Sequence, residues 1–292
     1  MKTETIIITH RTLEPGNPEF KWSESSYQGF ADQLKRGFSI EFDPNFVKDG
    51  VIIAHDTTLK RITRGKDERP FLELTVGEAL TLPLDHGRLC TFAEIMELIR
   101  ASESQMNALH LKGKFQEPHY LDNLFEQLAP YQDMFSRMMI FDVNPVTARY
   151  LKARNSALVL APSVAHPYDI ERYNSAVLGT LITIEEAIAG KNEGIFDWVW
   201  GDEWDLVGPD GTKKTLYNAE NFRRLHEAGL KISLVTPELH ATSPGLLGGE
   251  AHPDGVDKEK LFRRIEEILS LGPDAICTDY PKDAQAMLQK TS

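Results

Sequence analysis

The sequence contains very little cysteine and no long apolar run. Only Cys90 and Cys277 occur among 292 residues, which excludes a disulfide framework and a cluster of cysteine metal ligands. No segment approaches the roughly 20 consecutive apolar residues that span a bilayer. The apolar stretch Ile6–Ile8 is too short for the core of a signal peptide, and Lys2 is the only basic residue before it. We therefore expect no transmembrane segment and a cytoplasmic protein.

The sequence also has fewer basic residues than acidic ones. Lys and Arg total 32 against 44 Asp and Glu, which gives a formal net charge of −12. The average field of such a protein repels a polyanion, so we expect no nucleic-acid partner. A small molecule is the partner that the composition favours, and the sequence does not indicate an oligomeric state.

Short apolar runs alternate with longer helical patterns, and no low-complexity linker divides the chain. A length of 292 residues suits one α/β domain, expected to span 1–292. Eight repeats of this rhythm predict a closed parallel (β/α)8 barrel of the TIM type. The expected strands are Thr5–Thr9, Phe38–Phe42, Asn107–Leu111, Met138–Phe141, Leu158–Ala161, Phe196–Trp200, Lys231–Val235 and Ala275–Thr278. The expected helices are Ser25–Arg36, Val76–Leu80, Phe92–Arg100, Tyr120–Leu128, Val146–Arg154, Asn218–Ala228, Lys258–Leu271 and Lys282–Gln289.

The rhythm is interrupted after the second expected strand. Two apolar runs there are joined by Asp49-Gly50, a pair that favours the two-residue type I′ turn of a β-hairpin. With that pair as the loop, Pro44 faces His55, and the hairpin returns His55 to the side of Asp43. The sequence thus predicts a small β-hairpin inserted after strand two.

Polar side chains gather at the carboxyl ends of the expected strands, which form the substrate-binding face of a barrel. Residues two apart on a strand share a face, so Glu41 points with Asp43, and His110 points with Lys112. Two carboxylates held together at such a mouth require a cation, and a hard divalent ion with oxygen ligands is the natural choice. We predict that Glu41, Asp43 and His110 surround one metal ion while Lys112 supplies fixed positive charge.

Two further histidines lie at strand ends, His10 after the first strand and His55 after the hairpin. Histidine titrates near neutral pH, so such a pair can act as general acid and general base on an anionic substrate such as a phosphate ester. Each group also has a structural interpretation. A strand-end histidine can simply be hydrogen-bonded, and Asp142, Asp202 and Asp279 can cap the helices that follow. Five candidate groups at consecutive strand ends favour the catalytic interpretation.

The order of these motifs resembles the glycerophosphodiester phosphodiesterase family, to which the spider-venom phospholipases D are related. That family carries His-Arg-Gly after strand one, Pro-Glu-Asn-Thr before the first helix and Glu-x-Asp on strand two. A Lys-Asp-Gly hairpin, His-Asp, Leu-x-Arg-x-Thr and a closing Thr-Asp-x-Pro follow. The similar segments here are His10-Arg11-Thr12, Ser23–Ser26, Glu41–Asp43, Lys48–Gly50, His55-Asp56, Leu59–Thr63 and Thr278–Pro281.

The resemblance implies a barrel with a hairpin insertion that cleaves a small glycerol-type or lysolipid-type phosphodiester. It implies His10 and His55 as the acid–base pair, Glu41 and Asp43 as metal ligands, and Arg11 as a phosphate contact. The attacking group can then be a hydroxyl of the substrate itself, with a cyclic phosphate as the product. One divalent ion, Mg²⁺ or Ca²⁺, is the implied cofactor.

Three positions depart from the family pattern. His110 replaces an acidic residue of strand three, which admits Mn²⁺ or Zn²⁺ as the metal. Thr12 replaces the glycine of the first motif. Val235 replaces the tryptophan of strand seven, so an aromatic wall of the alcohol pocket has to come from Trp200 or Trp204. The predicted substrate-binding residues are Arg11, Lys112 and Trp200.

Two other functions fit parts of this pattern. His110 and the lost tryptophan also suit a catalytically reduced barrel that binds a phosphorylated ligand without turnover. A metal-dependent sugar isomerase uses similar ligands, but it would leave His10 and His55 without a role. An amidohydrolase is disfavoured because the first strand lacks His-x-His. The function that we predict from the sequence is that of a metal-dependent phosphodiesterase.

Overall fold

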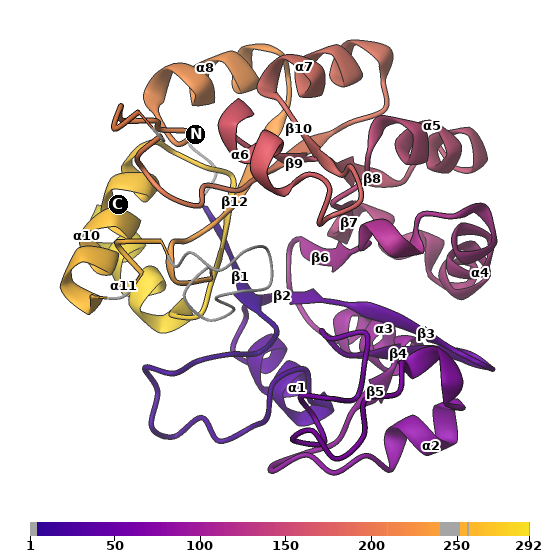
Figure 1. The fold of residues 1–292 in the computed structure, drawn as a ribbon. Helices are drawn as coiled ribbons and strands as arrows, with labels where there is room; N and C mark the ends of the chain where they lie inside the picture. Colours follow the sequence, from indigo (N-terminus) through magenta and orange to yellow (C-terminus); the bar gives the residue numbers. More distant parts are fainter. Residues whose placement is uncertain (1–4, 209, 240–251, 256, 292) are drawn as a thin grey trace.

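Eight parallel strands form a barrel in the computed structural model, which describes residues 5–208, 210–239, 252–255 and 257–291 (Figure 1). Only Pro162 separates β8 from β9, so the two act as one strand that pairs with β7 on one side and with β11 on the other. Pairing of β13 with β1 completes the ring, which confirms the predicted (β/α)8 architecture. The barrel strands are β1 (Ile6–His10), β2 (Ser39–Phe42), β6 (Asn107–His110), β7 (Met138–Phe141), β8 (Val159–Ala161), β9 (Ser163–Val164), β11 (Trp198–Gly201), β12 (Lys231–Val235) and β13 (Ala275–Thr278).

Helices surround the barrel, and the described part of the chain contains none that is long and apolar enough to cross a bilayer (Figure 1). All eight expected helices are present, with ends that differ from the expected ones by at most two residues. They are α1 (Tyr27–Lys35), α2 (Val76–Leu80), α3 (Phe92–Arg100), α4 (Pro118–Leu128), α5 (Pro145–Arg154), α8 (Ala219–Glu227), α10 (Lys258–Ser270) and α11 (Pro281–Thr291). Elements that the sequence did not predict are α6 (Pro167–Tyr173), β10 (Leu181–Ile182), α7 (Ile184–Glu193) and the 3₁₀ helices Phe71–Glu73, Gly113–Phe115 and Ala129–Arg137.

Alternate residues of the barrel strands build two apolar layers. On β1, Ile7 belongs to the large layer between strands and helices, and Ile8 belongs to the layer inside the barrel. Cys277 lies fully buried in the inner layer, and Cys90 is buried in the outer one, both as free thiols. The apolar interior therefore fills the barrel and leaves its polar groups at the ends of the strands.

The insertion after β2 is a small antiparallel sheet, as predicted, but its register differs. The loop is Lys48-Asp49, one residue earlier than expected, and Pro44 faces Ile53 instead of His55. The predicted loop was therefore wrong by one residue, and the predicted partners across the hairpin were wrong by two. The sheet consists of β3 (Pro44–Val47), β4 (Gly50–Ile53) and β5 (Cys90–Thr91).

The glycine of the hairpin serves packing and not the turn. A Cβ atom on Gly50 would lie 2.8 Å from Val76 Cγ2 at the start of α2, so only glycine allows this approach. Asp49 Oδ1 accepts a hydrogen bond from Val76 N at 2.7 Å, which fixes the same contact. Ala54 N donates to Asp43 O at 3.1 Å. The hairpin therefore still returns the chain to Asp43, as the sequence predicted.

We expect Gly190→Ala to lower the free energy of unfolding by about 1–3 kcal/mol, because the added methyl group would lie 2.5 Å from Phe196 Cε2 under α7. Gly77→Ala is the matched control. Gly77 is exposed on α2, where a Cβ atom would meet only Thr75 Oγ1 at 4.0 Å, so this variant should gain about 0.5–1 kcal/mol from helix propensity. Urea unfolding followed by circular dichroism measures both, and equal effects would contradict the packing argument.

Candidate active site

A cavity of about 590 Å³ lies at the carboxyl ends of the barrel strands, where the sequence predicted the site. It brings together all but one of the predicted site residues. The exception, Asp43, is fully buried and contacts the lining residues His110 and Lys112. The predicted residues that line the cavity are His10, Arg11, Glu41, His55, His110, Lys112 and Trp200.

The predicted metal ligands form one cluster. Glu41, Asp43 and His110 each offer a ligand atom, and these atoms lie within 4.8 Å of one another. Asp43 Oδ1 accepts hydrogen bonds from Lys112 Nζ at 2.7 Å and from His110 Nδ1 at 2.9 Å. Among the described residues, its second oxygen, Oδ2, is buried without a hydrogen-bond partner. Two buried carboxylates with an unsatisfied oxygen fit a bound cation.

Electrostatics support the same interpretation. Burial, and then the charge of Asp43, raises the pKa of Glu41 above its usual range. Burial also disfavours ionised Asp43, but Lys112, His55 and His110 outweigh it and hold the pKa of Asp43 well below its usual range. Two carboxylates therefore compete for too little positive charge. A divalent ion would allow both to be ionised.

His110 lies between two acids. Its Nδ1 donates to Asp43, and its Nε2 lies 3.4 Å from Asp142 Oδ2. Burial opposes the charged imidazolium, but the hydrogen bonds with Asp142 and Asp43 prevail and raise the pKa of His110 to about 9. The ring stacks on Phe141, with ring centroids 4.6 Å apart. In this structure His110 is thus a partly buried cation held in a fixed orientation.

Each predicted catalytic histidine is paired with a carboxylate through Nδ1. His10 Nδ1 lies 2.8 Å from Asp279 Oδ1, and His55 Nδ1 lies 2.8 Å from Asp56 Oδ1. Burial, and then Arg11, lowers the pKa of His10, while burial, and then Lys112, lowers the pKa of His55 to about 4. Both rings are therefore neutral at pH 7. With Nδ1–H donated to an acid, each ring has Nε2 as its proton acceptor.

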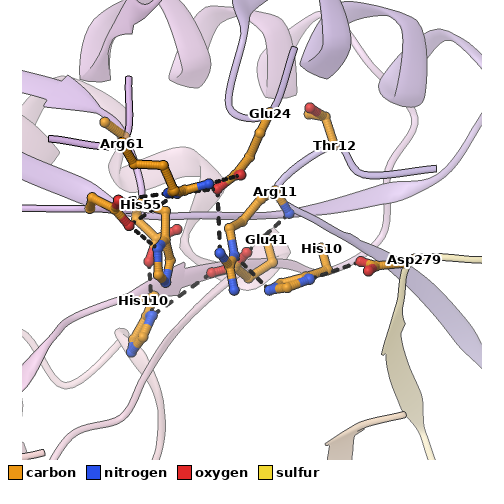
Figure 2. Close-up of polar contacts among 12 residues, drawn as sticks. His10, Arg11, Thr12, Glu24, Glu41, His55, Arg61, His110 and Asp279 are labelled. Carbon is orange, nitrogen blue, oxygen red and sulfur yellow. Dashed lines mark hydrogen bonds and ion pairs between the residues drawn. The ribbon is translucent and has the colours of Figure 1, made fainter. Parts of the chain in front are cut away.

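A chain of alternating charges joins the two histidines (Figure 2). Arg11 Nε donates to His10 Nε2 at 2.6 Å, and Arg11 Nη1 lies 3.3 Å from Glu24 Oε1. Arg61 then bridges Glu24 and Asp56, with Nη2–Oε1 and Nε–Oδ2 distances of 2.9 and 2.6 Å. Burial opposes ionised Glu24, yet Arg61 and Arg11 lower its pKa to about 2. The chain ends at His55 through its bond to Asp56.

The backbone after β1 explains why the family pattern has glycine where this chain has Thr12. Arg11 and Thr12 have φ values of 50° and 65°, in the left-handed region that a β-branched residue rarely adopts. Thr12 is fully buried, and its hydroxyl donates to Ser23 O at 3.4 Å. This conformation lets Arg11 N donate to Glu41 Oε2 at 3.2 Å. The strained turn therefore ties the end of β1 to the acidic cluster.

Both candidate tryptophans line the cavity, although Trp200 and Trp204 are largely buried. Trp200 stacks on Phe141 with ring centroids 3.8 Å apart, which extends the stack from His110. Trp204 packs on Tyr173 with a centroid distance of 4.8 Å. Phe141 and Trp200 thus line the cavity in one apolar cluster with Val235, which replaces the tryptophan of the family pattern.

The sequence prediction missed five polar residues that hold these groups in place. Four of them stand within the quoted motifs, so their positions were visible, but their pairing depends on the tertiary fold. Asp142 had only its strand-end position as a signal, and it has a positive φ of 66°. The missed residues are Glu24, Asp56, Arg61, Asp142 and Asp279.

Comparisons with known proteins identify the fold. The chain matches no protein-family model and no curated protein sequence. It does match solved structures, among them a glycerophosphoryl diester phosphodiesterase from Parabacteroides distasonis ATCC 8503, with 16% identity and a TM-score of 0.67 over 99% of this chain and 88% of that one. The fold is that of the glycerophosphodiester phosphodiesterases. The sequence resemblance is therefore confirmed at the level of structure.

Two further structures agree. A protein from Galdieria sulphuraria, assigned as a glycerophosphodiester phosphodiesterase, is 18% identical over 98% of both chains, with a TM-score of 0.68. A phosphodiesterase from Oleispira antarctica, solved with the product sn-glycerol-3-phosphate, is 15% identical over 98% of this chain and 97% of that one, with a TM-score of 0.62. Both alignments extend over nearly the whole length of each chain.

In the metal-free protein, we expect the pKa of His55 to lie below the usual histidine value and the pKa of His110 to lie above it. His55 should lose its proton near pH 4, because burial and Lys112 disfavour its charge, whereas His110 should keep its proton up to about pH 9. Nitrogen-15 NMR of the rings measures both, with His55→Gln and His110→Gln assigning the signals. Titration of both rings near pH 6.5 would contradict the described hydrogen bonds.

Proposed function

We propose that this chain is a metal-dependent phosphodiesterase that cleaves a small glycerol-type or lysolipid-type diester. One observation carries the proposal: two neutral histidine–aspartate pairs and an acidic cluster that fits a metal ion meet at one cavity. The solved structures that share the fold support it, including the Oleispira antarctica enzyme with bound sn-glycerol-3-phosphate. A cytoplasmic location and the absence of a nucleic-acid partner remain predictions from the sequence.

The residues that would hold the ion are Glu41, Asp43 and His110. When bound, a divalent ion would neutralise charge on a phosphoryl oxygen and orient the substrate. The two carboxylates suit Mg²⁺ or Ca²⁺, and the imidazole admits Mn²⁺ or Zn²⁺. Because His110 is protonated in the metal-free structure, its ring has to release a proton before it can donate a lone pair to an ion.

The histidines would divide the proton transfers between them. One neutral ring accepts a proton at Nε2 from the attacking hydroxyl. The other ring has to take up a proton from solvent at Nε2 first, and this imidazolium, stabilised by its aspartate, then gives the proton to the leaving oxygen. Asp279 and Asp56 hold the rings in the tautomer that this requires, through their hydrogen bonds to Nδ1. Arg11 covers Nε2 of His10 in this structure. A phosphate that draws Arg11 away would expose that nitrogen at the moment of binding.

Cations near the histidines would bind the phosphate. Lys112 Nζ forms an ion pair with Asp43 and donates a hydrogen bond to the carbonyl oxygen of His55. Lys114 lies close enough that burial, and then the charge of Lys112, lowers its pKa to about 8. An anion between two ammonium groups would relieve this repulsion. The cavity is therefore locally cationic although the whole chain is acidic.

A catalytically reduced barrel that binds a phosphorylated ligand is the second candidate. The observation that favours it is the pair of cations, His110 and Lys112, already placed on Asp43. Assays of a panel of phosphodiesters with Mg²⁺, Ca²⁺, Mn²⁺ and Zn²⁺ separate the two functions. Turnover that depends on the ion supports the enzyme, and binding without turnover under every ion supports the reduced barrel.

Replacing either His10 or His55 with Ala should lower kcat by about 10²–10⁴-fold, because each would remove one proton transfer. The fold should persist, since both rings lie among polar groups at the barrel mouth. His86→Ala is the control, since that exposed histidine lies outside the cavity lining. Phosphodiesterase assays and thermal unfolding test the three variants. Full activity in either active-site variant would exclude that residue from the acid–base pair.

His110→Glu should raise the affinity for Mg²⁺ and Ca²⁺ and lower the preference for transition metals, because it adds an anionic oxygen beside Glu41 and Asp43. The same variant should be less stable without metal, since it gathers further negative charge around Asp142. His110→Gln, which removes the ring without adding charge, is the control. Calorimetric titrations with Mg²⁺, Ca²⁺ and Mn²⁺ at two pH values give the rankings. Identical metal rankings in parent and Glu variant would show that His110 is not a ligand.

A further inference from the structure

The cavity has two chemically different sides. The part of the lining described above includes the histidines and the acidic cluster, whereas a second group of lining residues is apolar. We name this second group the apolar arm, formed by Tyr173, Val177, Leu178, Leu181 and Trp204. Tyr173, Leu181 and Trp204 are buried and pack in one cluster, so they form a firm wall. None of the proton transfers proposed above uses these residues.

The loop 174–180, which carries Val177 and Leu178 of the apolar arm, is held in place by internal hydrogen bonds. Gly179 N donates to Asn174 O at 2.8 Å, and Leu181 N donates to Asn174 Oδ1 at 3.0 Å. Thr180 Oγ1 donates to Val177 O at 3.2 Å. These bonds close the loop after α6 and fix its direction. The arm is therefore a preformed surface in this structure.

Gly113 joins this loop to the catalytic side. It directly follows Lys112, and a Cβ atom at Gly113 would overlap Val177 O and lie 3.0 Å from Leu178 Cβ. Glycine is thus the residue that allows the loop to approach the end of the strand so closely. The apolar arm therefore begins beside the cationic groups that would bind a phosphate.

Leu178 is the most unusual residue of the arm. Its φ is 59°, a left-handed conformation that is unfavourable for a leucine, and its side chain remains 60% exposed. Neither packing nor backbone preference accounts for a leucine there. An apolar side chain kept exposed and strained at the edge of a cavity indicates a surface that a ligand covers.

The chemistry of the arm selects an uncharged hydrocarbon group. A quaternary ammonium group such as choline would need open aromatic faces. The face of Tyr173 is already engaged, because Arg172 Cζ lies 4.6 Å from its ring centroid and Trp204 packs against it. Val177, Leu178 and Leu181 offer only aliphatic surface.

We propose that the apolar arm binds an alkyl chain on the phosphodiester and that Leu178 determines this specificity. The proposal rests on the phosphodiesterase function proposed above and names its substrate class. The phosphate would lie at the cationic side of the cavity while the alkyl chain extends over the loop 174–180. Each methylene group buried in the arm should raise kcat/KM by about threefold, as expected for transfer of hydrocarbon from water.

A series of glycerol phosphodiesters with ethyl, butyl, hexyl and octyl alcohol groups tests the proposal, with glycerophosphocholine as the cationic member. All are assayed below the concentration at which they form micelles. We expect kcat/KM to rise with chain length and the choline diester to be a poorer substrate than the butyl diester. Equal kcat/KM along the series, or a preference for choline over butyl, would overturn the proposal.

Leu178→Asn is the decisive variant, because asparagine adopts the left-handed conformation readily but offers no apolar surface. It should keep the fold and lower the octyl-to-ethyl ratio of kcat/KM by about tenfold. Leu178→Met should retain the ratio. Val146→Asn is the matched control, since Val146 is 74% exposed on α5 and lies outside the cavity lining. An unchanged ratio in Leu178→Asn, or an equal loss in Val146→Asn, would remove Leu178 from the substrate-binding surface.

Binding measurements separate this proposal from the proposed function. Calorimetric titrations with octyl phosphate and ethyl phosphate need no turnover. If no diester is cleaved but octyl phosphate binds at least tenfold more tightly than ethyl phosphate, the phosphodiesterase function is excluded and the apolar arm is retained. If diesters are cleaved but both phosphates bind equally, the enzyme is retained and the arm is excluded.

Discussion

The buried pair of carboxylates, Glu41 and Asp43, is the constraint around which this site is organised. Strand alternation places both on one side of the chain at the mouth of the barrel, where burial makes two negative charges unfavourable together. Lys112 and His110 supply the nearest compensation, at 2.7 and 2.9 Å from Asp43. Removing either cation would leave the two buried carboxylates with less compensating charge, which is costly in an interior. The residues that a metal would need are therefore held in place before any ion arrives.

Compensation of charge also links phosphate binding to proton transfer. Arg11 lies between Nε2 of His10 and the carboxylate of Glu24, and Arg61 holds Glu24 from the other side (Figure 2). If a phosphate attracts Arg11, Glu24 keeps Arg61 as its counter-ion, and Nε2 of His10 is exposed to the substrate. The alternating chain thus allows one arginine to move without leaving an uncompensated acid. Under the proposed mechanism, binding of the anion would then make His10 Nε2 available for proton transfer, as base or as acid.

Much of this architecture could be predicted from the sequence because the barrel strands are apolar runs bounded by clear breaks. Most of the helices that were predicted have clear amphipathic patterns, namely α1, α3, α4, α8 and α10. Helix α7 was missed because its buried face, formed by Ile184, Ala187 and Gly190, is made partly of small residues, although the capping box at Thr183 was a visible signal. The hairpin register was missed because Gly50 is required by its close contact with Val76 of α2 and not by the turn. Local turn preference alone could not reveal that contact.

The site could be predicted to a similar extent and for a related reason. The strand ends determine which side chains face the mouth of the barrel, so the residues that line the cavity could be predicted from their positions. The hydrogen-bond partners of those residues could not be predicted, because pairs such as Glu24 with Arg61 join segments far apart in the chain. Sequence motifs showed that these residues were present, and only the fold showed that they connect His10 to His55.

The two sides of the cavity differ in how they are built, and this difference bears on substrate choice. Groups at the strand ends are fixed by the barrel and by one another's charge, so they can vary little without loss of the site. The loop 174–180 carries none of the charged groups at the strand ends and lies outside the motifs that resemble the family. It approaches the catalytic side of the cavity closely at Gly113. A change in this loop can therefore alter which alcohol group is accepted while the arrangement of acids, histidines and cations stays the same.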